Sequence, residues 1–144
     1  MSEISEKALK VLSGLVRDEE HISTSTGHPL AYEHDIELVK TLGKYEFKGD
    51  VEEAWEIYDE IASFIDKKCR KIRYADLSVP PDVASELALF KCDLPDLKMK
   101  FYVVAFEEAD AASGRAYSGL TFHKNLRKAL KDFTSEKKLL KERI

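Results

Sequence analysis

Residues 98–106 read KMKFYVVAF, and the secondary structure of this stretch decides the fold class. Its aromatic and β-branched residues favour a strand, whereas the acidic, alanine-rich continuation EEADAA at 107–112 favours a helix. A lone strand cannot satisfy its own backbone hydrogen bonds, and the rest of the sequence offers no evident partner strand. We therefore expect a helix over 98–106 that is apolar on most sides and lies at the centre of a bundle.

The most regular helical pattern lies upstream of this stretch. Apolar residues recur every three to four positions over about six turns from Val51 to Ile72, and Asp50 is a suitable N-cap. Acidic residues gather at the start of this predicted helix and basic residues at its end, as the helix dipole favours. The acidic residues are Glu52, Glu53 and Glu56, and the basic residues are Lys67, Lys68, Arg70, Lys71 and Arg73.

The other predicted helices rest on the same spacing of apolar residues. They are expected from Ser2 or Ser5 to about Glu20, from Pro29 to Gly43, from about Asp82 to Phe90, and from Tyr117 to Phe133. The hydroxyl-rich stretch at 21–29 is expected to form a loop. Residues 1–144 are therefore expected to form one all-α domain, a helical bundle of five or six helices. Its basic C-terminal tail at 135–144 is expected to fray.

The composition indicates a globular protein. Of 144 residues, 44% are hydrophobic and 35% are charged, which excludes a disordered chain. No apolar run approaches the roughly 20 residues that cross a bilayer, and the N-terminus lacks the apolar core of a signal peptide. We therefore expect a cytoplasmic protein without a membrane partner. Gln is missing and Asn125 is the single Asn, a usage typical of a thermophile or of chance in a short chain.

Charge is distributed unevenly along the chain. Residues 1–60 hold 15 acidic and 6 basic side chains, whereas residues 115–144 hold 9 basic and 3 acidic ones. Such asymmetry marks either a partner surface or two solvated helix faces. The leading expectation is a non-enzymatic protein-interaction module, a homo-oligomer or a binder of another protein, that uses these opposed charges or an exposed aromatic side chain. The aromatic candidates are Trp55, Tyr58 and Phe101.

Nucleic-acid binding is the first alternative to a protein-interaction module. The basic cluster of Lys67, Lys68, Arg70, Lys71 and Arg73 could contact phosphates, and the basic C-terminal region could extend it. The aromatic rings of Tyr74, Phe122 and His123 lie close to these basic segments in the sequence and could stack on bases. The acidic net charge of −4 and the helix dipole offer a structural explanation for the same residues.

Two carboxylate pairs supply the second alternative, a magnesium-dependent enzyme. Glu53-x-x-Glu56 and Glu107-x-x-Asp110 would each place two carboxylates one turn apart on a helix face, as a Mg²⁺ site needs. The pairs resemble those of the all-α nucleotide pyrophosphohydrolases of the MazG type, whose pairs lie closer together in sequence. The resemblance covers these two short motifs and implies Mg²⁺-dependent nucleotide hydrolysis. A solvated acidic helix face is the structural explanation.

Histidine and cysteine leave two further questions open. His21, His28 and His34 lie among carboxylates and either bind a transition metal or are exposed loop residues. Cys69 and Cys92 either form a disulfide or are two small buried side chains. No nucleophile motif and no cofactor motif is recognisable, so we expect no cofactor and lean away from an enzyme.

Overall fold

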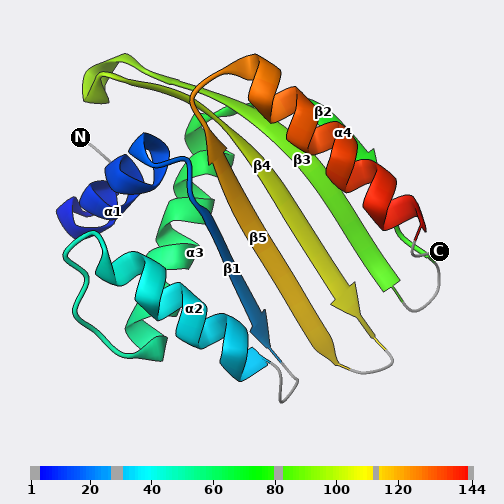
Figure 1. The fold of residues 1–144 in the computed structure, drawn as a ribbon, viewed down its shortest axis with the longest axis horizontal. Helices are drawn as coiled ribbons and strands as arrows, with labels where there is room; N and C mark the ends of the chain where they lie inside the picture. Colours follow the sequence, from blue (N-terminus) through cyan, green and yellow to red (C-terminus); the bar gives the residue numbers. More distant parts are fainter. Residues whose placement is uncertain (1–3, 27–30, 80–82, 112–113, 143–144) are drawn as a thin grey trace.

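The computed structural model describes residues 4–26, 31–79, 83–111 and 114–142. Within these ranges, a five-stranded antiparallel sheet lies between three helices on one face and a fourth on the other (Figure 1). The elements are α1 (Glu6–Arg17), β1 (His21–Thr26), α2 (Ala31–Gly43), α3 (Val51–Lys68), β2 (Arg70–Asp76), β3 (Val83–Leu94), η1 (Pro95–Leu97), β4 (Met99–Asp110), β5 (Arg115–His123) and α4 (Leu126–Glu142). The strand order is β1-β5-β4-β3-β2, so β2 to β5 form a meander that β1 joins beside β5.

The expected all-α bundle is wrong, and residues 98–106 are where the error begins. All of these residues except Lys98, which caps η1, lie in β4, the central strand, which pairs with β3 on one side and with β5 on the other. Its partners occupy segments that we expected to be helical, 82–90 and the part of 117–133 before Leu126. The fold is therefore α/β, with β4 hydrogen-bonded along both of its edges.

The strands escaped detection because both faces of the sheet are covered. In β3, Leu87 and Leu89 pack beneath α4, whereas Ala88 and Phe90 pack against α1, α2 and α3. A strand buried on both faces is apolar at successive positions and loses the alternation that identifies a strand with one solvated face. A spacing of three or four can then be picked out of a continuous apolar run, which is how Val83, Leu87 and Phe90 resembled a helix.

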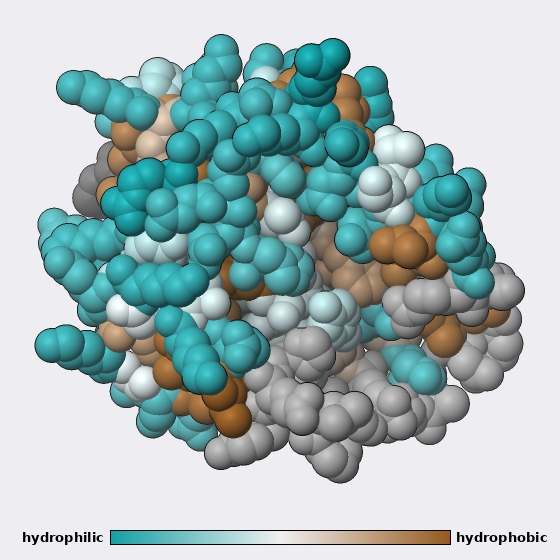
Figure 2. Space-filling view, viewed as in Figure 1, coloured by the Kyte–Doolittle hydropathy of each residue, from teal (hydrophilic) through white to brown (hydrophobic). Residues whose placement is uncertain are grey.

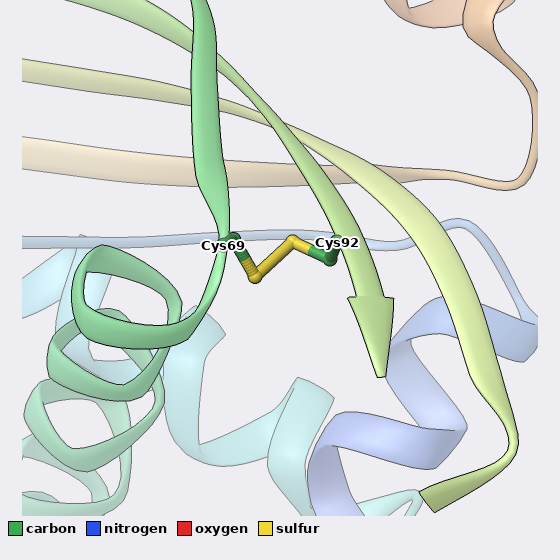
Figure 3. The surroundings of a disulfide bond; sticks show 2 residues. All are labelled: Cys69 and Cys92. Atoms are coloured by element: carbon green, nitrogen blue, oxygen red, sulfur yellow. A yellow bond between two sulfur atoms is a disulfide. The ribbon is translucent and has the colours of Figure 1, made fainter. Parts of the chain in front are cut away.

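Helix α3 ends earlier than its apolar spacing predicts, and a strand takes over. The helix stops at Lys68, and Cys69 adopts an extended backbone with φ −105° and ψ 156°. Arg70, Lys71 and Arg73, expected at the helix end, lie instead in the edge strand β2. A disulfide joins Cys69 to Cys92 of β3, so it fastens the junction of α3 and β2 to the sheet (Figure 3). The question that the sequence left open is thereby answered in favour of pairing.

Several helical predictions are confirmed, including their caps. The side chain of Ser5 accepts a hydrogen bond from the Ala8 amide at the start of α1, and that of Asp50 accepts one from the Glu53 amide at the start of α3. Helix α2 ends at Gly43, as expected. Helix α4 contains the segment 126–133 and continues through the predicted tail to Glu142. None of the helices in the described ranges is long and apolar enough to cross a membrane.

The predicted loop at 21–29 is wrong where the structure describes it. Residues 21–26 form β1 and pair with β5 from His21↔Thr121 to Thr26↔Ala116, whereas 27–30 lie outside the described residues. Ile22 points into the core beneath α1 to α3, and the polar residues on either side of it point to the α4 face. With one large apolar residue in six, this strand carries almost no hydrophobic pattern.

Candidate functional site

A groove lies on the α4 side of the sheet, between α4 and strands β1 and β5. Its volume is about 380 Å³. Its apolar lining comes from Leu87, Val104, Phe106 and Leu140, and its polar lining from His21, Tyr117, Thr121 and Glu136. We call this cavity the α4 groove. Figure 2 shows pale and brown residues between hydrophilic ones near the middle of the face where Figure 1 places β4 and β5.

The register of β1 and β5 sets the polar floor of the α4 groove. His21 and Thr121 are cross-strand partners, and His21 Nδ1 lies 2.7 Å from Thr121 Oγ1. Gly119 is the next residue of β5 on the same face. A Cβ atom at Gly119 would lie 3.1 Å from Cε1 of His21, so the absence of a side chain there lets the imidazole lie close to the strand. The imidazole ring of His21 is therefore positioned by its contact with the Thr121 hydroxyl and by its close approach to Gly119.

Glu136 supplies a carboxyl group on the helix wall of the groove, one turn before Leu140. Burial raises the pKa of Glu136, and the negative charge of Asp132 raises it further. Among the described residues Glu136 forms no hydrogen bond or ion pair. The α4 groove thus contains a partly dehydrated carboxyl whose ionised form lacks a compensating partner.

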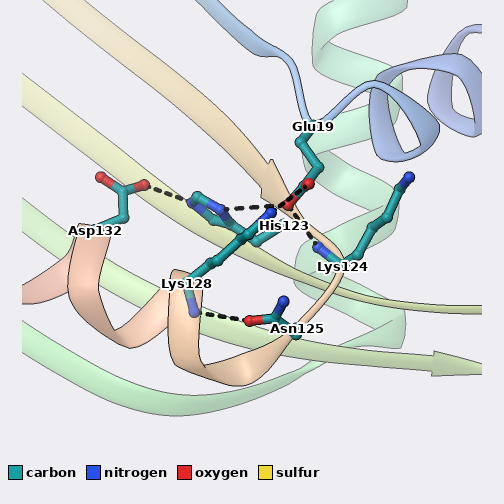
Figure 4. A network of polar contacts seen from close by, with 6 residues as sticks. All are labelled: Glu19, His123, Lys124, Asn125, Lys128 and Asp132. Carbon is teal, nitrogen blue, oxygen red and sulfur yellow. Dashed lines mark hydrogen bonds and ion pairs between the residues drawn. The ribbon is translucent and has the colours of Figure 1, made fainter.

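A polar network lies at the start of α4 and joins it to β5 and to the turn after α1 (Figure 4). His123, two residues after Thr121 on the same strand face, places Nε2 2.8 Å from Oδ2 of Asp132. Its Nδ1 lies 4.0 Å from Oε2 of Glu19. Glu19 accepts hydrogen bonds from the Lys128 ammonium at 3.0 Å and from the Lys124 amide at 3.2 Å.

These contacts lower the pKa of Glu19, chiefly through the Lys128 hydrogen bond and then through the Lys124 amide. Glu19 belongs to the turn that follows α1, whereas Lys128 and Asp132 belong to α4. The network therefore ties the two layers of helices together across the end of β5. Its geometry explains how α4 is held in place, and it leaves His123 engaged with Asp132.

A second depression, of about 470 Å³, lies near the first residue of α4. Its basic side chains are Arg70, Lys71 and Arg73 of β2 and Lys91 of β3, and we call these four residues the basic surface. Its apolar lining comes from Ile72, Tyr102 and Leu126. In the part of the chain that the structure describes, none of the four basic residues forms an ion pair. Their charges are therefore available to an external anion.

The basic residues that the sequence selected lie on two elements, and three of the five line the depression. Lys67 and Lys68 end α3, whereas Arg70, Lys71 and Arg73 lie in β2. Of the aromatic residues considered beside them, Tyr74 is 50% exposed, whereas Phe122 is fully buried. The Lys71 ammonium lies 5.0 Å from the centroid of the Tyr74 ring, and the Tyr74 hydroxyl donates a hydrogen bond to Glu86 at 2.9 Å.

The carboxylate pairs fall on different kinds of element. Glu53 and Glu56 lie in the first turns of α3, and Glu53 forms an ion pair with Lys7 at 3.7 Å. Glu107 and Asp110 lie in β4, where an odd separation sends side chains to opposite faces of the sheet. The helix expected to hold Glu107 and Asp110 on one face is therefore wrong. Within the described residues, no group of three or more His, Cys, Asp or Glu side chains could hold a metal ion.

The aromatic residues considered for a protein interface are largely enclosed. Tyr58 is 4% exposed and Phe101 is fully buried. Trp55 is partly buried, and its indole N–H donates a hydrogen bond to Asp35 at 2.9 Å. Of the three histidines considered for a metal, His21 lies in the α4 groove and His34 in α2, whereas His28 lies outside the described residues.

Sequence reasoning missed Glu136 and Thr121, which it never singled out. Glu136 is one acidic residue in a basic segment, and only the packing of α4 on the sheet turns it towards His21 and Thr121. A usable signal was Gly119, a glycine within an apolar and aromatic stretch, because glycine inside a strand often marks a close approach. In the helix predicted over 117–133, the same glycine would instead indicate close helix packing or a bend.

In comparisons with protein-family models, with curated proteins and with solved structures, nothing matched this chain at a significant level.

Proposed function

We propose that this protein is a non-enzymatic module that binds single-stranded nucleic acid through the basic surface. The observation that carries the proposal is the clustering of Arg70, Lys71, Arg73 and Lys91 around one depression without carboxylate partners among the described residues. Backbone phosphates are the anions that such a cluster of Arg and Lys side chains binds without regard to sequence. Tyr74 of the same edge strand lies outside the depression, but its ring is 50% exposed and 5.0 Å from the Lys71 ammonium, so it offers a platform at the edge on which a base can stack.

The surroundings of the basic surface support the same partner. Leu126, which lines the depression, is the first residue of α4, so the positive end of that helix dipole lies beside it. The outward side of α4 extends the positive charge away from the depression through Arg127, Lys128, Lys131, Lys137, Lys138 and Lys141. The acidic helices α2 and α3 lie on the other face of the sheet, where they repel a polyanion least.

The edge strand β2 is built for recognition by side chains more than for pairing with another strand. Its register shifts between Lys71 and Arg73, which marks a β-bulge or irregularity, and its exposed side chains are mostly basic. Bulges and lysines on an edge oppose strand addition by a second chain. A flexible nucleic-acid strand that crosses this edge does not need regular backbone hydrogen bonds to β2. Its phosphates can bind the basic side chains instead.

The decisive experiment measures the salt dependence of binding to a short, mixed-sequence, single-stranded oligonucleotide. The triple variant Arg70→Glu, Lys71→Glu, Arg73→Glu removes three phosphate contacts. We expect the slope of log K against log salt to flatten by about 2, because each contact on a single strand contributes about 0.7. Fluorescence anisotropy between about 50 and 200 mM salt provides the measurement.

A matched control is available on the acidic side of the molecule. Lys10→Glu, Lys40→Glu, Lys48→Glu changes the net charge by the same amount, but these residues belong to α1, α2 and the segment after α2. The control triple should bind nearly as tightly as the wild type. An equal loss of affinity in both triple variants would show that net charge, and not the basic surface, determines binding. If the wild type binds no oligonucleotide at low salt, the proposal is refuted.

Head-to-tail self-association is the second candidate, and one observation favours it. The acidic layer of α1 to α3 and the basic outward side of α4 lie on opposite faces of the sheet, so two copies can stack with unlike charges in contact. Sedimentation velocity at low and high salt tests this candidate without nucleic acid. Association that dissolves as salt rises supports it, and a monomer at every concentration and salt removes it.

A further inference from the structure

We propose that the α4 groove is a binding site for a small organic cation, an ammonium group carried on an aromatic or apolar body. The proposal concerns a part of the molecule other than the basic surface and does not depend on nucleic-acid binding. It follows from the size of the groove, from the sign of its charge and from the arrangement of its aromatic rings.

The volume of the groove fits a small molecule. Ligand cavities in proteins commonly measure about 300–1,000 Å³ and combine an apolar lining with a few convergent polar groups. The α4 groove has about 380 Å³ and is lined by Leu87, Val104 and Leu140 on its apolar side. This space holds one ring with a short side chain, and it is too small for a folded peptide.

The charge of the groove selects a cation. Among the described residues that line it, Glu136 alone carries a formal charge at neutral pH, and no Lys or Arg contributes to the lining. Asp132, one helical turn before Glu136, adds negative potential from the same side of α4. An ammonium group beside Glu136 would supply the partner that this carboxyl lacks in the described structure and would compensate for its lost hydration.

Two aromatic rings strengthen the preference for a cation with an apolar body. Phe106 and Tyr117 lie on neighbouring strands, with ring centroids 5.5 Å apart and planes inclined by 58°. Both residues line the groove, and the face of an aromatic ring attracts an ammonium group. Tyr117 and Phe106 therefore favour the same charge as Glu136 and also pack against the body of the ligand.

The floor of the groove offers polar groups for orientation. The His21 imidazole, held by its contact with Thr121, lies across the groove from α4. Two rows farther along the same sheet face, just outside the lining of the groove, Ser25 and Ser85 flank Tyr117 and Glu108 in register. Both serine hydroxyls are buried and have no hydrogen-bond partner within the described structure. Buried hydroxyls of this kind commonly indicate an ordered water or another small polar guest nearby.

Three probes that share one body and differ in charge test the proposal directly. They are phenethylamine, which is cationic, phenylethanol, which is neutral, and phenylacetate, which is anionic. We expect phenethylamine to bind at least about tenfold more tightly than either of the others, the ratio that corresponds to one charge-assisted hydrogen bond. Isothermal titration calorimetry gives the affinities. Amide chemical shifts in β1, β5 and α4 locate the bound probe.

Glu136→Gln preserves the shape of the side chain and removes its charge, so it should abolish the preference for the amine while leaving the weak binding of phenylethanol unchanged. Glu142→Gln is the matched control, because Glu142 is an exposed residue of the same helix outside the groove. Circular dichroism confirms that both variants fold. Equal affinity for all three probes, an unchanged preference in Glu136→Gln, or binding of none of the probes would each overturn the proposal. Both variants leave the basic surface intact. They should therefore bind oligonucleotides as the wild type does, whatever their affinities for the three probes.

Discussion

Gly14 in α1 leaves no room for a side chain. A Cβ atom there would lie 2.1 Å from Cδ1 of Tyr45, so the tyrosine ring packs directly against the helix backbone. The Tyr45 hydroxyl donates a hydrogen bond to Asp18 at 2.7 Å, and burial together with this bond raises the pKa of Tyr45. The glycine, which weakens the helix by its own propensity, is thus explained by a packed ring.

We expect Gly14→Ala to lower the free energy of unfolding by about 1–3 kcal/mol, the usual cost of overpacking a core. Urea denaturation monitored by circular dichroism measures the change. Gly43→Ala is the matched control, because a Cβ atom there has no neighbour within 4 Å. This control should be neutral or should stabilise the protein by up to about 0.5 kcal/mol through helix propensity. Similar losses in both variants would show that Tyr45 does not press on Gly14.

The raised pKa of Glu136 predicts a pH-dependent effect of its removal. The folded protein holds the Glu136 proton more tightly than the unfolded chain does, so stability falls as pH rises from the usual value of about 4.3 through the raised one. Asp132 on α4 and His21 and Tyr117 on the sheet are the titratable groups lining or flanking Glu136. Glu136→Gln should therefore gain stability relative to the wild type at neutral pH and lose that gain in acid. Denaturation series across this pH range check the sign, and a gain that grows in acid would contradict the assignment.

The disulfide between Cys69 and Cys92 links the end of α3 covalently to the sheet. Cys69 and Cys92 are separated by 23 positions, and closing a loop of this length stabilises a protein by about 3 kcal/mol in the chain-entropy model. We expect Cys69→Ala, Cys92→Ala to lower the unfolding free energy by about this amount. Reduction of the wild type under the same conditions should produce a similar loss without changing the packing volume. A much larger loss in the double variant than in the reduced wild type would assign the excess to the cavity left at Cys92.

The elements divide clearly into those the sequence could predict and those it could not. Helices α1 and α3 each have one apolar stripe and a side-chain cap, at Ser5 and Asp50, so local chemistry and burial agree. Strands β3 and β4 are buried on both faces, and their apolar residues follow one another without a period. Strand β2 follows directly after the basic end of α3. Its basic residues suit a helix C-terminus as well as a strand, so charge could not show where the helix ends. For these strands the information lies in pairing between distant segments, which a scan of neighbouring residues cannot detect.

The candidate sites follow the same division. The cluster of Arg70, Lys71 and Arg73 was visible in the sequence because its members are neighbours, and only its secondary structure was mistaken. The α4 groove was invisible, because His21, Thr121 and Glu136 come from three elements that meet only when the sheet forms. The hydroxyl-rich composition of 21–29 predicts a loop because such side chains compete for backbone hydrogen bonds, and β1, with Ile22 as its single large apolar residue, has no hydrophobic pattern to oppose that prediction.

For the molecule as a whole, the position of β4 predicts where the structure opens least. It is the central strand, and Phe101 and Val103 are fully buried against the helical layer. Amides of β4 should therefore exchange with solvent only by global unfolding, whereas those on the outer sides of β1 and β2 should exchange by local opening. Native-state hydrogen exchange followed by NMR tests this order. Faster exchange in β4 than in either edge strand would be incompatible with the five-stranded sheet.

The pairing of β1 with β5 joins His21 to Thr121, 100 positions later in the chain. During translation, β1 emerges from the ribosome long before the strand it needs. Until β5 has also emerged, the backbone donors and acceptors of β1 depend on water, and Ile22 has no sheet neighbour against which to pack. The sheet can therefore acquire the β1–β5 pairing only after residues 115–123 have been synthesised, and a nascent chain that stalls before residue 115 would remain without it.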